Sequence, residues 1–255
     1  MASYLISAED FEDDELKSIY ADIKNRLNFN SGDLDMIFEI ALKHRDRFPA
    51  INLNGGFTLE RYIERWINGY AKAMGNIPSK RIAKPKSSCA DPSLKTVVKA
   101  VLGLSEEEAA SGETYHNLFM SAENILGNLM EEYIASRVKP YGFLWCEGNV
   151  LSAIDFCNSD GTFFLQIKNK SNSENSSSSK IREHTEVQIE KWYRLGTRSE
   201  KNKKVPTYKW EVLNKFINDH KTMGIGLAPC CMTEDDYQNF LQRKASENHS
   251  LITNQ

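Results

Sequence analysis

The sequence predicts an α/β fold, with a central mixed β-sheet flanked by helices and a helical N-terminal region ahead of it. Apolar residues recur at helical spacing through the first 75 residues. Between residues 141 and 170, β-branched and aromatic runs are separated by turn residues, a pattern typical of strands. We therefore expect a helical region over residues 1–104 and an α/β core with C-terminal helices over residues 105–255.

The N-terminal region is expected to form helices over residues 8–28, 32–48 and 59–75. Ser7 opens a pattern that resembles a capping box, and Thr58 is placed to cap the third helix. Tyr62, Trp66 and Tyr70 recur every four residues along that helix. Such an aromatic stripe is typical of a helix face packed in a core, and we prefer that interpretation to a cofactor site.

The composition indicates a globular protein without disulfides or membrane spans. Apolar residues make up 40% of the chain and charged residues 26%. The net charge of −3 argues against a surface that is basic all over, but a local basic groove is enough to bind nucleic acid. Five cysteines without a Cys-x-x-Cys pair indicate a reducing cytoplasm and no zinc module. We expect neither a signal peptide nor a membrane span.

Residues 147–170 are predicted to form a β-hairpin. Two strand-like runs, NVLSAIDF and TFFLQIKNK, are joined by a turn over residues 158–161. Because side chains alternate along a strand, Gln166 and Lys168 lie on one face of the second run. Asp155 on the first run is expected to lie close to both.

An aspartate, a glutamine and a lysine at one point suit metal-assisted chemistry on a phosphate. Carboxylate and carbonyl oxygens are the ligands that Mg²⁺ prefers. A lysine beside them can orient or deprotonate an attacking water while the metal stabilises negative charge on the phosphate. The plainer interpretation is a surface hairpin that carries Asp, Gln and Lys near its ends without any function.

Helices and one further strand are expected on both sides of the hairpin. Before it we expect a helix from Pro92 to Leu104, a capping box of Ser105 with Glu108, a helix over 121–138 and a strand over 141–146. After it, the pattern predicts a helix capped by Thr185 and ended by Gly196, which packs on the sheet. The remaining expected elements are a helix over 209–220, a strand over 224–229 and a helix over 233–245.

Three polar or basic segments are candidates for contact with DNA phosphates or base edges. They are Lys80, Arg81, Lys84 and Lys86 in the segment 77–92, the segment that follows the hairpin, and the basic run 201–204. In the second segment the candidates are Lys170, Asn172, Ser176, Ser177, Ser178, Lys180, Arg182 and His184. A flexible linker or simply solvated charge explains the same composition.

The spacing of Asp155 and Gln166-Ile167-Lys168 resembles the PD-(D/E)XK nuclease motif. In that motif an Asp on one strand and a Glu-x-Lys on the next carry phosphodiester hydrolysis. Ile154 stands where the motif often has Pro, and Gln166 stands where it usually has Asp or Glu. The runs 127–156 and 165–182 look like those of type II restriction endonucleases of the SinI kind.

The resemblance implies a restriction-endonuclease-like core in a homodimeric, Mg²⁺-dependent enzyme that cuts double-stranded DNA. The expected target is a short palindrome, G-G-(A or T)-C-C, cut to leave 5′-phosphates, with a cognate DNA methyltransferase as genetic partner. Asp155 would ligate Mg²⁺ with Gln166 and the Ile167 carbonyl nearby, and Lys168 would orient the attacking water. Glu123, on the helix before the hairpin, is the candidate extra acid that compensates for Gln166.

Two other functions remain open at this point. One is a DNA repair or recombination nuclease on the same core, which recognises the structure of DNA and not its sequence. The other is a non-enzymatic DNA-binding module in which Gln166 marks a lost metal site.

Overall fold

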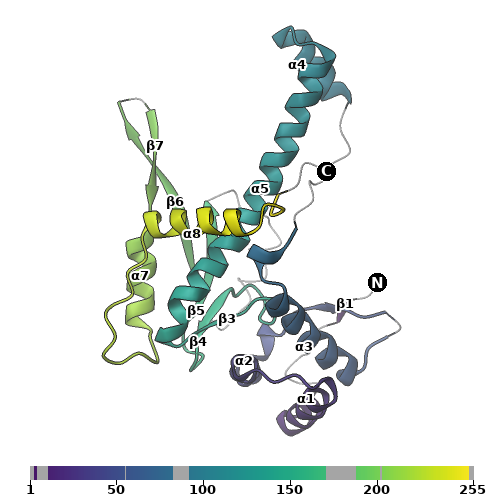
Figure 1. The fold of residues 1–255 in the computed structure, drawn as a ribbon. Coiled ribbons are helices and arrows are strands. Elements are labelled where there is room, and N and C mark those ends of the chain that lie inside the picture. The colour runs from purple at the N-terminus through teal and green to yellow at the C-terminus, as the bar shows by residue number, and fades with distance from the viewer. Residues whose placement is uncertain are drawn as a thin grey trace. The chain divides into compact units, whose positions relative to one another are not determined.

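The computed structural model describes residues 3–4, 11–54, 56–82, 92–170, 188–201 and 203–252. They form the predicted mixed α/β fold, in which a five-stranded sheet is accompanied by helices (Figure 1). The chain divides into two compact units. The first unit comprises Met1–Asn76 and Tyr133–Tyr237, and the second comprises Ile77–Glu132 and Gln238–Gln255. The predicted boundary near residue 104 stays a prediction.

The N-terminal part of the first unit is helical, as predicted. It contains α1 (Asp13–Leu27), α2 (Gly32–Lys43), the 3-10 helix η1 (Arg45–Arg47), α3 (Leu59–Gly75) and the short paired strands β1 (Ser3–Tyr4) and β2 (Ile51–Asn52). The Thr58 hydroxyl caps α3 by accepting a hydrogen bond from the Arg61 N–H at 3.3 Å. The first helix starts at Asp13, not at residue 8, and Ser7 lies outside the described residues.

The sheet contains the predicted hairpin. Its strands, in spatial order, are β3 (Phe143–Trp145), β4 (Phe156–Asn158), β5 (Phe164–Lys170), β6 (Ile189–Glu200) and β7 (Lys203–Tyr208). Strands β4 and β5 pair antiparallel, with Phe156 opposite Leu165, and the turn of residues 158–161 joins them. Strand β6 runs parallel to β5, and every other pair is antiparallel.

The N-terminal helices cover part of one face of this sheet and hold the hairpin. Phe164 lies on that face in one core with residues of α1, α2 and α3, and the His44 ring meets it edge-on at 5.1 Å. His44 Nε2 also lies 3.2 Å from the carbonyl oxygen of Gly161 in the hairpin turn. On the opposite face, Trp192 of β6 packs against Trp210 of α7 (Trp210–Asp219), with ring centroids 5.0 Å apart. The sheet is therefore positioned from both sides.

The predicted helix over residues 185–196 is wrong, because residues 189–200 form β6. Lys191 pairs with Gln166, so its side chain lies on one face of the sheet, while Trp192 is buried on the other. Gly196 lies within the strand and does not end a helix: a Cβ there would come within 2.9 Å of Thr207 Oγ1. Thr185, the predicted cap, lies outside the described residues.

Two predicted strands also differ from the structure. The first strand of the hairpin begins at Phe156 and not at residue 149, because Asn149 and Ala153 have φ values of 56° and 61°, which break an extended chain. The predicted strand over 224–229 is wrong, since this described segment consists of turns and loop, with Gly224 and Gly226 at φ 75° and 94°.

The second unit consists mainly of helices. It contains η2 (Pro78–Lys80), α4 (Pro92–Leu102) and most of α5 (Glu106–Val138), which continues into η3 (Lys139–Tyr141), and α8 (Glu234–Glu247) crosses into it from the first unit. The predicted capping box is confirmed: the Glu108 N–H donates to Ser105 Oγ, and the Ser105 N–H donates to the Glu108 carboxylate. The helix predicted over 121–138 is the later part of α5. None of the described helices is long and apolar enough to cross a bilayer.

Candidate active site

Asp155 is held between β3 and β5 by its own backbone. Its N–H donates to the Leu165 carbonyl at 3.0 Å, and its carbonyl accepts from the Cys146 N–H at 2.9 Å. The loop that leads to Asp155 is anchored on the N-terminal helices, since Trp66 Nε1 donates to the Val150 carbonyl at 2.9 Å. Gly148 lies at φ 81°, and a Cβ there would come within 2.8 Å of the Gly69 carbonyl oxygen. The local fold therefore fixes where Asp155 sits.

The Asp155 carboxylate takes the place of a strand partner for β5. Its Oδ2 accepts a hydrogen bond from the Ile167 N–H at 2.6 Å. In an extended strand the N–H and C=O of one residue point to the same edge. The Ile167 carbonyl therefore points to the edge at which the Asp155 carboxylate lies. Two oxygen donors of the kind that bind Mg²⁺ share this edge.

Gln166 and Lys168 lie on one face of β5, as predicted. Both pair in parallel register with β6, Gln166 with Lys191 and Lys168 with Tyr193. Gln166 is buried, and Lys168 is exposed. The positive charge of Lys168 acts on the Asp155 carboxyl. The structure thus brings Asp155, Gln166, Ile167 and Lys168 together at the open end of the β4–β5 hairpin.

The Asp155 carboxyl is held at higher energy in its charged form. Burial raises its pKa, and the negative charge of Glu147 raises it further. The Ile167 N–H and the charge of Lys168 lower the pKa, but the net shift is upward. A partly buried carboxylate whose nearby positive charge does not offset the cost of its burial is a group that a bound cation would stabilise.

Glu147 is an acidic neighbour of Asp155 that the sequence prediction missed. It comes two residues after β3, and its charge reaches the Asp155 carboxyl. The sequence carried no signal for it, because Glu147 approaches Asp155 only through the pairing of β3 with β4, the strand that follows Asp155. Within the described ranges, no three His, Cys, Asp or Glu side chains gather closely enough to hold a metal ion. Asp155 and Glu147 are thus a pair and not part of a larger acidic cluster in this part of the chain.

Of the other predicted site residues, Glu123 and Lys170 lie within the described part of the chain. Glu123 is exposed on α5 and belongs to the second unit, whereas Asp155 belongs to the first. The buried acid of α5 is Glu132, which accepts hydrogen bonds from the Ser79 N–H at 2.7 Å and the Ser79 hydroxyl at 2.6 Å. Lys170 is exposed at the end of β5. Lys80, Lys201, Lys203 and Lys204 are exposed, and Arg81 is half-buried. The predicted DNA contacts that lie outside the described residues are Asn172, Ser176, Ser177, Ser178, Lys180, Arg182, His184, Lys84 and Lys86.

Comparison with known proteins finds one family whose model matches the part of the chain that contains this hairpin. A family model described as SinI restriction endonuclease matches residues 70–219, which include β3 to β7. The type II restriction enzyme SinI of Salmonella infantis is 30% identical over 182 residues, covering 67% of this chain and 76% of that enzyme. The type II restriction enzyme Eco47I of Escherichia coli is 30% identical over 196 residues, covering 75% of this chain and 81% of that enzyme.

Proposed function

This chain belongs to the SinI restriction endonuclease family, and we propose that it uses Mg²⁺ at Asp155 to cut both strands of a short palindromic DNA site. That it is a type II restriction endonuclease with DNA as its substrate follows from the family. The finer proposal rests on one observation: the Asp155 carboxylate and the Ile167 peptide group share a strand edge, with Lys168 beside them.

The residues present fit a hard divalent cation. Asp155 and the Ile167 carbonyl would hold Mg²⁺ directly, and the Gln166 amide oxygen is a weaker third donor. Glu147, whose charge reaches the Asp155 carboxyl, is the candidate for an additional acid. When bound, Mg²⁺ would supply positive charge that stabilises the phosphate as negative charge grows on it during attack.

Lys168 is proposed to orient the attacking water. Its ammonium donates a hydrogen bond to the water oxygen and holds it in line with the bond to be broken. The water oxygen forms a new bond to phosphorus while the bond from phosphorus to the 3′ oxygen breaks. The attacking water gives a proton to solvent and the departing 3′ oxygen takes a proton from solvent, so the products carry a 5′-phosphate and a 3′-hydroxyl.

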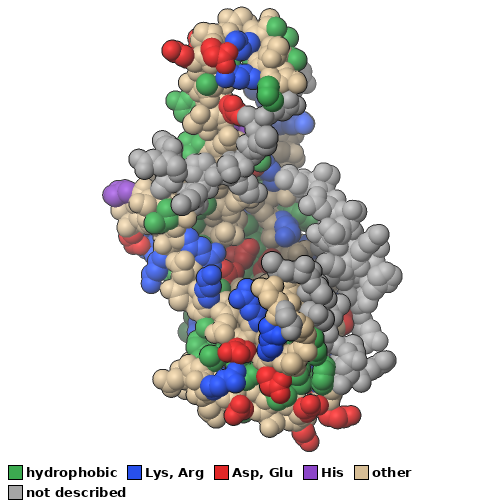
Figure 2. Space-filling view, turned by 90° about the vertical axis from the view of Figure 1, so that its right-hand side faces the viewer, with side chains coloured by type: hydrophobic (Ala, Val, Ile, Leu, Met, Phe, Trp, Pro, Cys, Tyr) green, Lys and Arg blue, Asp and Glu red, His purple; other side chains and the backbone are tan. Residues whose placement is uncertain are grey.

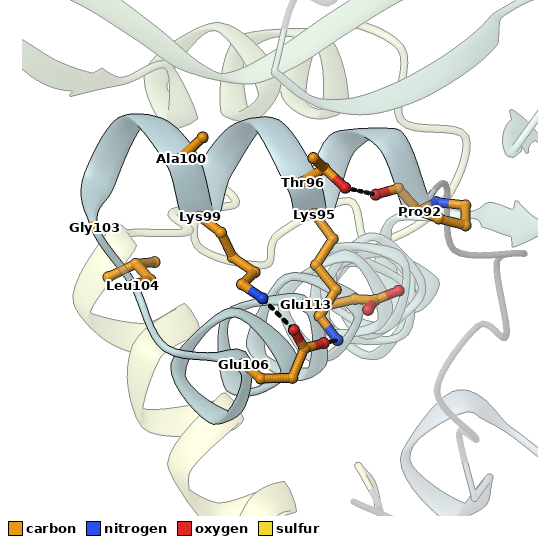
Figure 3. Close-up of a pocket in the computed structure, with 9 residues that line it drawn as sticks. All are labelled: Pro92, Lys95, Thr96, Lys99, Ala100, Gly103, Leu104, Glu106 and Glu113. Atoms are coloured by element: carbon orange, nitrogen blue, oxygen red, sulfur yellow. Dashed lines mark hydrogen bonds and ion pairs between the residues drawn. The ribbon is translucent and has the colours of Figure 1, made fainter.

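We also propose that the enzyme acts as a homodimer. The support is that the charged side of α4 faces α5 while its apolar side is exposed. Lys95 and Lys99 of α4 point toward Glu106 of α5 and form ion pairs with it (Figure 3). The apolar side chains on the other side of α4 are exposed, with Leu94, Val97 and Val101 at 65%, 58% and 74%. At the top of Figure 2, where α4 lies, hydrophobic side chains stand beside charged ones. An amphipathic helix that turns its apolar stripe outward indicates a partner surface.

A second copy of the chain is the partner that we propose for this stripe. A palindromic site has two-fold symmetry, and a two-fold dimer presents the same patch from both copies. Full burial of a Val or Leu side chain contributes about 1.5–3 kcal/mol, so three from each copy give a substantial apolar contact. Val97→Glu should convert dimers to monomers in light scattering, and the control Thr96→Glu on the other side of α4 should not. A wild-type monomer at micromolar concentration would contradict the dimer.

One digestion tests the main proposal and separates it from the other candidate functions. Phage DNA is incubated with the enzyme and Mg²⁺, and with EDTA as control. Discrete bands with Mg²⁺ and intact DNA with EDTA are expected, and ligation-based end mapping should return 5′-phosphates at a G-G-(A or T)-C-C site. Cutting of branched DNA alone would support a repair nuclease. Intact DNA under both conditions would support a binding module.

The proposed biological setting follows from the same activity. A cytoplasmic enzyme that cuts a short site would also cut the DNA of its own cell, so a cognate methyltransferase must protect that site. Phage DNA methylated by such an enzyme should resist digestion, and its cleavage into the same bands would contradict this partnership.

A further inference from the structure

The β6–β7 ribbon extends beyond the rest of the sheet. Strand β5 ends at Lys170, which pairs with Leu195 of β6. From Gly196 to Glu200, β6 pairs with β7 and with no other described strand. Figure 1 shows this part as a two-stranded arm. Residues 197–201, 203 and 204 are all exposed, so the arm is not packed into a core.

The arm is basic although the whole chain is acidic. Residues 195–208 contain four basic side chains and one acidic side chain, for a formal net charge of +3. The whole chain has a net charge of −3. The basic residues are Arg198, Lys201, Lys203 and Lys204. A local positive charge of this kind on an exposed element favours a polyanionic partner.

The two faces of the ribbon carry different charged side chains: Lys204 alone on one face, and Arg198, Lys203 and Glu200 on the other. Side chains alternate along β6, so Thr197 and Ser199 continue the face that carries Gln166 and Lys168 in the sheet. Lys204 pairs with Ser199 and lies on that same face, where the ribbon has no acidic residue. On the opposite face, Glu200 forms an ion pair with Arg198 at 3.0 Å and pairs in register with Lys203.

Protection of an exposed strand edge is the alternative explanation for these lysines. Strand β7 is an edge strand of the sheet, and lysine and proline are common on such strands because they prevent pairing with another chain. Pro206 has no N–H to donate to a further strand, which disfavours a second copy of this chain as the occupant of the edge. Edge protection does not require one face to be free of acids and aligned with the candidate active site.

We propose that the β6–β7 ribbon is a DNA-binding arm whose Lys204 contacts a backbone phosphate near the cleavage site. The proposal rests on the proposed function, because it assumes that DNA is cut at the Asp155 site and that the face carrying Lys204 continues the face of that site. A strand rises about 3.4 Å per residue, so the five residues from Gly196 to Glu200 span roughly 17 Å. The major groove of B-DNA is about 12 Å wide and admits a two-stranded ribbon.

The salt dependence of DNA binding tests the role of Lys204. A duplex carrying the site mapped by wild-type digestion is titrated in EDTA at several salt concentrations. Each phosphate contact contributes about 0.9 to the slope of log affinity against log salt. Lys204→Ala should weaken binding and reduce the slope by about this amount, while Lys204→Arg should retain it. The matched control Lys203→Ala, on the opposite face of the same strand, should leave the slope unchanged.

An unchanged slope in Lys204→Ala, or an equal loss in Lys203→Ala, would overturn the proposal. Because both lysines are exposed, the variants should melt at the wild-type temperature, so that misfolding does not produce the effect. A double variant with Lys203→Glu and Lys204→Glu gives a further test. If it converted dimers to monomers and kept the wild-type slope of log affinity against log salt, the arm would be a contact between copies and the proposal would fail. Wild-type enzyme that fails to cut DNA would refute the proposed function separately, since the slope test measures binding alone.

Discussion

Replacement of Asp155 by Asn and by Ala should have opposite effects on stability and the same effect on activity. In the metal-free protein the Asp155 carboxylate accepts the Ile167 N–H at 2.6 Å. Ala removes this acceptor and leaves the N–H unsatisfied, which costs about 1–3 kcal/mol. A loss of 1 kcal/mol lowers Tm by about 2–4 °C in a chain of this size, so Tm should fall by roughly 2–12 °C.

Asn keeps an acceptor oxygen and removes the charge whose burial raises the pKa of Asp155. In EDTA at pH 7 the Asp155→Asn variant should therefore be at least as stable as the wild type. The folded protein binds the Asp155 proton more tightly than the unfolded chain, in which the pKa is near 3.8. The wild type consequently loses stability relative to Asp155→Asn as pH rises from about 3.8 through the folded pKa, and the difference vanishes below that range.

Thermal unfolding in EDTA at several pH values and cleavage rates in Mg²⁺ measure the two effects. Both variants should lose cleavage by about 10²–10³-fold or more, because each removes the carboxylate that is proposed to hold the cation. Asp155→Asn melting below Asp155→Ala would refute the hydrogen-bond argument. Either variant cutting at the wild-type rate would remove Asp155 from the mechanism.

Three further substitutions test other parts of the account. Lys168→Ala should slow single-turnover cleavage by about 10²-fold or more with duplex affinity changed only a few-fold, and a wild-type rate would exclude it as the group that orients water. Gly148→Ala should destabilise the fold by about 1–3 kcal/mol, since φ is 81° and the new Cβ meets the Gly69 carbonyl; an unchanged Tm would contradict that close approach. Arg194→Ala should cost about 3–5 kcal/mol in denaturant titrations by leaving the partly buried Glu234 carboxylate without its cation, and a loss below 1 kcal/mol would show that the pair is replaceable.

The elements predicted correctly from the sequence are those with local signals. The hairpin turn is one example, because the Asn158 side chain accepts hydrogen bonds from the N–H groups of Thr162 and Phe163 at 3.0 and 2.9 Å. The Ser105–Glu108 capping box is another, since both of its bonds span three residues. Such patterns are visible in a short window of sequence.

The elements predicted incorrectly depend on distant partners. Residues 189–200 form a strand because β5 offers its edge in parallel, and a short window of sequence does not contain that edge. The segment 224–229 has the composition of a buried strand, yet Ile225 is 97% exposed, so no sheet receives it. Glu147 was missed because its closeness to Asp155 follows from the pairing of β3 with β4 and not from spacing.

A crystal of the wild-type enzyme grown with duplex DNA and Mn²⁺ in place of Mg²⁺ tests the central claim most directly. Anomalous scattering locates Mn²⁺ independently of the protein density. We predict a peak within about 2.0–2.3 Å of an Asp155 carboxylate oxygen, with Lys168 Nζ facing a water beside it. A peak at other carboxylates, with Asp155 still bonded only to the Ile167 N–H, would contradict the account.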